Sequence, residues 1–156
     1  MIPEIGHFLL WLALGVSLVL GTLPLIGAAR GNHAWMSIVR PGTYILMGLV
    51  TLAYLCLVAA FVMNDFSVIN VERNSNSALP LAYRIAASWG SHEGSLLLWI
   101  LMLAIWSGAV ARFSKGMPIA MVARTLAVMG LISVGFLMFL LLTSNPFDRQ
   151  FDVPAD

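Results

Sequence analysis

Two ionisable side chains, His92 and Glu93, stand next to each other in the stretch WGSHEGS, which runs from Trp89 to Ser95 at the start of an apolar run. A histidine beside a carboxylate can relay protons, bind a polar ligand such as a quinone headgroup, or hydrogen-bond to neighbouring helices. Ionisable groups at membrane depth are costly and therefore often mark functional sites. The alternative is structural: in the first turn of a helix Glu93 complements the helix dipole and caps free amides, and His92 lies among hydrated headgroups. The residues alone leave both interpretations open.

The spacing excludes a zinc-protease site in this stretch. The HExxH motif needs a second histidine at its fifth position, and that position holds Leu96. Because neighbouring helical residues point about 100° apart, His92 and Glu93 cannot chelate one ion together. His7 and His33 flank apolar runs and are interpreted as solvated interfacial residues, and nothing in the spacing requires a bis-histidine haem site from His7 and His92. The sequence therefore predicts no catalytic residue and no metal ligand.

Two further side chains, Arg84 and Cys56, are a charged group and a reactive group that could take part in a site. Arg84 precedes Ser88 by one turn and could pair with Glu93, with a propionate or with an anionic headgroup, although a solvated helix face is the simpler interpretation. The single cysteine, Cys56, lies in an apolar run, and no CxxC motif exists, so neither a disulfide framework nor a dithiol redox site is encoded. Cys56 is expected to be a packing residue.

The elements that carry these side chains must be membrane helices. Of the 156 residues 60% are hydrophobic and 10% are charged, and the mean hydropathy is +0.93, whereas soluble domains carry about 25% charged residues. Such a chain cannot cover a water-facing surface, so the expected fold class is all-α, a polytopic transmembrane helical bundle. The net charge of +1 gives no footprint for nucleic acid.

Four apolar stretches are long enough to span a bilayer, which takes about 20 helical residues. The expected spans are residues 8–29, 42–64, 91–111 and 118–143, with an outer loop at 65–90. Together they are expected to form one membrane domain over residues 1–156, an up-and-down bundle whose last helix ends at Asn145 and Pro146. Small residues are expected to let the helices approach: Gly15, Gly21, Gly48, Gly108, Gly130, Ser133 and Gly135.

The loop at 65–90 is expected to contain one short helix. The stretch NVERNSNSALP is rich in Asn and Ser and predicts irregular structure. Pro80 suits the first turn of a helix, and apolar residues then recur at helical spacing, so residues 80–89 are expected to form an amphipathic helix at the membrane interface. Gly90 ends this helix, and Tyr83 and Trp89 fit the aromatic belt at headgroup depth.

The basic residues predict the orientation of the bundle. Five of the eight basic residues follow the first and third spans or open the fourth, on one side of the membrane: Arg30, Arg40, Arg112, Lys115 and Arg124. The other three lie on the opposite side, together with most of the acidic residues. The loops at 30–41 and 112–117 are therefore expected in the cytoplasm, with both termini and WGSHEGS outside. A cleavable signal is not expected, because residues 1–6 contain an acid and no basic residue.

Three stretches carry a resemblance to a known family. They are MIPEIGHFLLWLALG at the start, FVMNDFSVINVERNSNSALPLAYRIAASWGSHEGSLLLW in the middle and GFLMFLLLTSNPFDR near the end. Over essentially its whole length the sequence resembles the N-terminal part of the CcmF/NrfE family, the haem lyase subunits of system I cytochrome c maturation. The resemblance implies a multi-pass protein of the bacterial inner membrane, with both termini of this segment in the periplasm.

The resemblance also implies chemistry and partners. The family joins haem to the CxxCH cysteines of apocytochrome c by thioether formation on the periplasmic side. Its members receive haem from a periplasmic haem chaperone, work with an apocytochrome-binding maturation subunit, and carry haem b in the membrane. The tryptophan-rich segment and the axial histidines of the family lie outside this sequence, so the 156 residues alone are not expected to be catalytic.

The resemblance implies that this chain forms part of the outer wall of the haem vestibule or contacts a partner protein. Two other function classes remain open: a scaffold or docking subunit of a split lyase, and a respiratory membrane subunit in which the ionisable pair touches a quinone. The candidate residues for the vestibule or partner contact are Arg84, Trp89, Gly90, His92, Glu93, Gly94 and Ser95.

Overall fold

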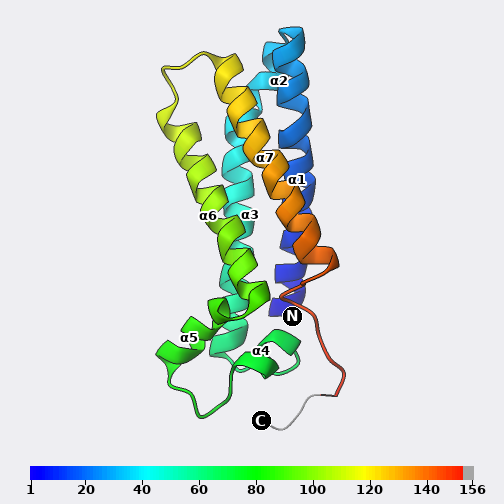
Figure 1. Ribbon diagram of the computed structural model, residues 1–156, viewed down its shortest axis with the longest axis vertical. Coiled ribbons are helices and arrows are strands. Elements are labelled where there is room, and N and C mark those ends of the chain that lie inside the picture. The colour runs from blue at the N-terminus through cyan, green and yellow to red at the C-terminus, as the bar shows by residue number, and fades with distance from the viewer. Residues whose placement is uncertain (153–156) are drawn as a thin grey trace.

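The computed structural model describes residues 1–152 and shows a bundle of helices (Figure 1). Four helical spans are long and apolar enough to cross a membrane. They are α1 (Ile2–Arg30), the short α2 (His33–Ser37) with α3 (Val39–Val62), α6 (His92–Phe113) and α7 (Ile119–Leu142). Two further short helices are α4 (Ile69–Asn74) and α5 (Leu81–Gly90). The predicted fold class is confirmed, and α5 confirms the short helix predicted at residues 80–89.

The long helices close a ring in which each packs against two neighbours. α1 lies against α3 and α7, and α6 lies against α3 and α7 from the other side. Figure 1 shows the N-terminus, α4, α5 and the end of the described chain at one end of the bundle, which we call the motif end. α2 and the connection between α6 and α7 lie at the opposite end. The expected up-and-down bundle is therefore confirmed.

Both the core and the outer faces of the bundle are apolar. The largest fully buried side chains include Phe61, Leu97 and Leu137. Trp99 is 64% exposed and Trp106 is 66% exposed on the outer face of α6. Water would disfavour such a surface, whereas hydrocarbon accepts it, so the exposure pattern is that of a bundle surrounded by lipid or by other membrane helices.

Close helix contacts depend on some of the predicted small residues. A Cβ added at Gly21 of α1 would lie 2.6 Å from the Leu131 side chain of α7, and one added at Gly130 would lie 3.3 Å from the Gly21 amide nitrogen. A Cβ added at Gly108 of α6 would lie 2.6 Å from the Met47 sulfur of α3. These glycines let the helix backbones approach, as predicted.

Of the other predicted small residues, Ser133 is buried in α7, whereas three glycines make no close helix contact within the described chain. A Cβ added at Gly15, Gly48 or Gly135 would meet nothing within 4 Å among residues 1–152. The packing role predicted for these three glycines is therefore wrong for the contacts of this bundle, because they lie on outward faces.

Two short helices occupy segments that were predicted to be loops. α2 forms in the connection at 30–41 because Asn32 Oδ1 accepts a hydrogen bond from Ala34 N at 3.0 Å and caps the helix. α4 begins at Ile69 and covers the first half of the stretch predicted to be irregular, where Asn74 Nδ2 donates to the Asn70 carbonyl at 2.8 Å. Asparagine favours loops by composition, but at a cap or at i, i+4 spacing it supports a helix. The first span also begins earlier than predicted, at Ile2.

Candidate functional site

WGSHEGS forms a tight corner in which one residue, Ser91, separates α5 from α6. Ser91 Oγ caps α6 by accepting a hydrogen bond from Gly94 N at 3.0 Å. Ser95 Oγ donates to the Trp89 carbonyl at 2.7 Å and ties the first turn of α6 to the end of α5. Glu93 lies in the first turn as expected, but the side-chain cap is made by Ser91.

The two glycines of the motif have different surroundings. A Cβ added at Gly94 would overlap the Ser88 carbonyl oxygen of α5, so the corner closes because residue 94 has no side chain. A Cβ added at Gly90 would meet no atom of residues 1–152 within 4 Å. Ser88 Oγ donates to the Ile85 carbonyl at 2.7 Å and lies 3.4 Å from the Tyr54 hydroxyl of α3. The corner is thus held against α3.

His92 and Glu93 leave the corner in different directions. His92 is exposed, and its ring meets Phe139 of α7 edge-on with the ring centroids 6.3 Å apart. Glu93 is half-buried and lines a polar pocket between α4, the start of α6 and the chain after α7. The rotation between successive helical residues accounts for this divergence. The two side chains are therefore available for separate contacts.

The pocket beside Glu93, which we call the motif-end pocket, has a volume of about 270 Å³. Asn70 is 5% exposed, and its Oδ1 accepts from Asn74 Nδ2 at 3.0 Å, whereas its Nδ2 has no hydrogen-bond partner within residues 1–152. Because a buried unpaired amide is costly, this donor favours a polar group in the pocket. The lining residues are Ile69, Asn70, Arg73, Asn74, Glu93, Thr143, Ser144, Asn145 and Asp148.

Arg84 holds the loop before α5. Its Nε donates to the Leu79 carbonyl at 2.9 Å, and its Nη atoms donate to the Ser77 carbonyl at 2.9 Å and to the Val62 carbonyl of α3 at 3.3 Å. The two ion pairs seen in residues 1–152 involve other groups. The predicted solvated face and the pairing with Glu93 are both wrong, because three backbone carbonyls surround the planar fork of the guanidinium.

The segment after α7 folds back along the connection between α3 and α4. Ile69 N donates to the Asp148 carbonyl at 2.9 Å, and Gln150 N donates to the Ser67 carbonyl at 2.9 Å. α7 ends at Leu142, shortly before the Asn-Pro pair predicted to end it. The backbone of this segment therefore forms one wall of the motif-end pocket and is fixed by hydrogen bonds to the opposite wall.

The same segment contacts the start of α1. The buried Phe147 ring occupies the space beside Gly6, where an added Cβ would overlap it. His7 is hydrogen-bonded at both ring nitrogens: Trp11 Nε1 donates to Nε2 at 3.0 Å, and the Asn145 amide lies 2.9 Å from Nδ1. The sequence interpretation of His7 as a solvated residue missed this contact, because Asn145 lies 138 residues away in the sequence.

The described histidines do not pair with one another as haem ligands within residues 1–152. His7 has a partner at each ring nitrogen, and His92 lies exposed beside Phe139. His33 is exposed on α2 at the opposite end of the bundle. Within residues 1–152 no group of three His, Cys, Asp or Glu side chains is placed to hold a metal ion. A bis-histidine pair from His7 and His92 therefore has no geometric support.

Comparison with known proteins places this geometry in a family. No family model matches the chain. The chain is 55% identical over 149 residues to the cytochrome c-type biogenesis protein CcmF of Pseudomonas aeruginosa, and this alignment covers 96% of the chain and 23% of the relative. It is 54% identical over 157 residues to CcmF of Haemophilus influenzae, and this alignment covers 100% of the chain and 24% of the relative. The chain belongs to the CcmF family.

A solved CcmF structure has the same fold. The chain of a protein described as cytochrome c haem lyase CcmF matches with a TM-score of 0.89 at 27% identity, over 95% of this chain and 25% of that one. NrfE of Haemophilus influenzae, also a cytochrome c-type biogenesis protein, is 38% identical over 100% of this chain and 25% of its own length. The chain thus spans about a quarter of the length of the CcmF relatives that it matches.

Proposed function

We propose that this chain is the N-terminal membrane module of a haem lyase that attaches haem covalently to apocytochrome c. The identity of 55% and 54%, over nearly the whole chain, to proteins named for cytochrome c-type biogenesis carries this proposal. Thioether formation is assigned to the longer assembled protein. The module contributes the walls and contacts at its motif end.

We propose that the module lies in the bacterial inner membrane with its motif end toward the periplasm. Arg30, Arg112 and Lys115 lie at or near the opposite end, and basic residues favour the cytoplasmic side. Arg40 lies there too, where its Nε donates to the Ala111 carbonyl at 3.2 Å near the end of α6. In this orientation the N-terminus and the segment after α7, which both lie at the motif end, face the side on which haem is attached.

Within the motif end, three side chains are available to the haem vestibule or to a partner. They are His92, Glu93 and Trp89, which is 43% exposed. Gly94 and Arg84 shape the corner and the loop before it, and the two serines of the motif are engaged in hydrogen bonds. The candidate contact surface is therefore narrower than the motif.

The proposed partners follow from the family. They are the remainder of the haem lyase, a periplasmic haem chaperone, an apocytochrome-binding maturation subunit, apocytochrome c and the surrounding lipid. Haem b of the complete protein is assigned axial ligands outside this chain, which agrees with the geometry of His7, His33 and His92. Within Haemophilus influenzae the identity is 54% to CcmF and 38% to NrfE, which favours the CcmF branch.

Substitution of the available side chains tests the proposal. In the protein at its natural length, His92→Ala and Glu93→Ala are each expected to lower the yield of mature cytochrome c about tenfold, comparable to the loss of one hydrogen bond to a charged group. His33→Ala, an exposed histidine at the opposite end, is expected to leave the yield unchanged. The measurement is haem-stained cytochrome c relative to the amount of lyase in the membrane.

A further variant and a contradicting outcome complete this experiment. Glu93→Gln keeps the size of the side chain in the motif-end pocket, so a loss of yield in this variant assigns the effect to the charge of Glu93. Equal yields in His92→Ala, Glu93→Ala and His33→Ala would remove the motif from the proposed function.

A further inference from the structure

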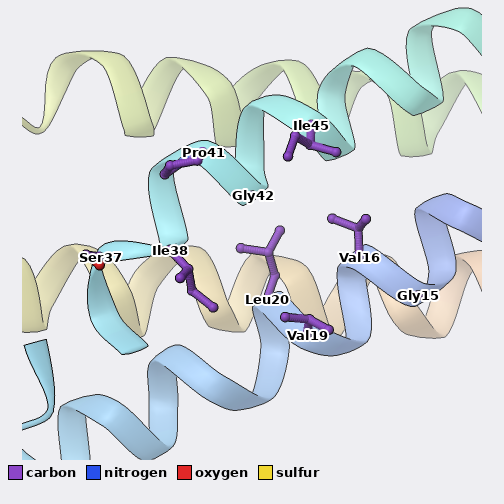
Figure 2. A pocket seen from close by; sticks show the side chains of 9 residues that line it. All are labelled: Gly15, Val16, Val19, Leu20, Ser37, Ile38, Pro41, Gly42 and Ile45. Carbon is purple, nitrogen blue, oxygen red and sulfur yellow. The ribbon is translucent and has the colours of Figure 1, made fainter. Parts of the chain in front are cut away.

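An apolar groove runs along the outside of the bundle between α1 and α3 (Figure 2). Its volume is about 580 Å³. It reaches the start of α3 and the residue before it, toward the end of the bundle opposite the motif end. Figure 2 shows Leu20 pointing from α1 toward Gly42 of α3, with Val16 and Ile45 facing each other further along. The haem-lyase role proposed above makes no use of this surface.

Gly15 keeps the groove deep on the α1 side, whereas on the α3 side Gly42 makes room for the Leu20 side chain of α1. A Cβ added at Gly15 would meet nothing within 4 Å in the described part of the chain, so open space lies directly above the α1 backbone. On the α3 side a Cβ added at Gly42 would lie 3.0 Å from a Leu20 methyl carbon. The Ser37 hydroxyl at the rim already donates to the Ala34 carbonyl at 2.7 Å. The groove therefore offers shape and apolar surface.

We propose that a membrane-spanning helix from the part of the lyase outside this chain packs into the groove. The lining residues recur four apart, as in Val16 with Leu20 on α1 and Pro41 with Ile45 on α3. The groove thus follows both helices for about two turns, and a ridge of side chains four apart on a third helix would fit it. The open space above Gly15 lets the backbone of that helix approach α1 closely.

The length of the relatives argues for this occupant. This chain covers 23% and 24% of two CcmF relatives, so most of each relative lies outside the four spans described here and is available to pack against them. On the groove walls Val19 is 46% exposed and Ile45 is 55% exposed. A lipid acyl chain would match the apolar surface but carries no ridges at helical spacing. The inference rests on membership of the family and is independent of the role proposed for His92 and Glu93.

Site-specific photo-crosslinking tests the occupant. A photoreactive amino acid replaces Val19 or Ile45 in the protein at its natural length, in native membranes. We expect crosslinks to an apolar peptide of the same lyase that lies outside residues 1–156, identified by mass spectrometry. The same probe at Trp106, an exposed apolar site on α6, is the control and is expected not to capture this peptide. Crosslinks to lipid alone, or to a second copy of residues 1–156, would overturn the proposal.

A substitution that fills the groove provides the second arm. Gly15→Leu is expected to reduce the crosslink from Ile45 about tenfold, because overpacking a helix contact is strongly unfavourable. Gly48→Leu is the matched control, an exposed glycine of α3 outside the groove, and is expected to leave the crosslink intact. No atom of residues 1–152 lies within 4 Å of either added Cβ, so both variants are expected to fold, which circular dichroism checks. An unchanged crosslink in a folded Gly15→Leu protein also contradicts the proposal.

Discussion

Ser91, Gly94 and Ser95 close the α5–α6 corner through a helix cap, a close backbone approach and a side-chain hydrogen bond. His92 and Glu93 take no part in that closure and point to different surroundings. The motif therefore combines residues that build a rigid corner with residues that the corner presents. A sequence pattern cannot separate the two groups, because glycine, serine and ionisable residues together are also typical of ligand-binding loops.

The two motif glycines give a residue-scale prediction. Gly94→Ala is expected to destabilise the protein by about 1–3 kcal/mol, because its methyl group would overlap the Ser88 carbonyl and force the corner open. Gly90→Ala is the matched control and is expected to change the unfolding free energy by less than about 0.5 kcal/mol, since the space around it is open in residues 1–152. Denaturant unfolding in detergent measures both variants, and an equal effect at the two positions would contradict the close contact.

At the scale of elements, the long helices and the short ones differ in how far sequence predicts them. The four spans follow from hydropathy, because each needs a long run of apolar residues. α5 is also predicted, because Pro80 and the apolar spacing after it are local signals. α2 and α4 are missed, because each is supported by a single asparagine side chain: Asn32 Oδ1 accepts from Ala34 N in α2, and Asn74 Nδ2 donates to the Asn70 carbonyl in α4.

The partners of the candidate site are predicted less well than the elements that carry it. Arg84 donates to a carbonyl 22 residues away, and His7 contacts Asn145 across 138 residues. Such contacts exist only after the bundle has folded, so no local pattern encodes them. The divergence of His92 and Glu93, by contrast, follows from helix geometry alone and is predicted.

Arg84 gives an element-scale prediction, because it links the loop at 77–79 to the end of α3. Arg84→Lys keeps the charge but cannot reach three carbonyls at once, so the loop is expected to open more often. Cleavage by a broad-specificity protease between residues 75 and 80 is expected to rise about tenfold, as for the loss of one hydrogen bond to a charged group. Arg73→Lys, at an exposed arginine of α4, is the control. Equal cleavage of the two variants would argue against the link.

At the scale of the whole molecule, the bundle has two unlike ends and an apolar groove on one flank. The motif end gathers polar side chains around two neighbouring pockets that share Asn145 and Asp148. The groove between α1 and α3 is almost wholly apolar. These surfaces suit different neighbours: the motif end suits polar groups outside the membrane, and the groove suits another helix within it.

The absorption spectrum of the purified 156-residue chain gives a whole-molecule prediction. We expect no stoichiometric haem b signal, because His7 is engaged at both ring nitrogens and His33 and His92 lie at opposite ends of the bundle. The longer haem lyase proposed above, purified in the same detergent, is the positive control. A stoichiometric haem b spectrum from the short chain would show that axial ligands lie within it.

The contact between the segment after α7 and the start of α4 has a consequence for biosynthesis. Gln150 Nε2 donates to the Phe66 carbonyl at 3.0 Å across 84 residues of sequence. At roughly 5–20 residues per second, a ribosome reaches Gln150 about 4–17 seconds after Phe66. Throughout that interval the connection after α3 lacks this partner, and for most of it α1 lacks a complete α7, against which it packs. The motif end holds the start of α1, the earliest helix of the module, and is nevertheless the last part of the module to close.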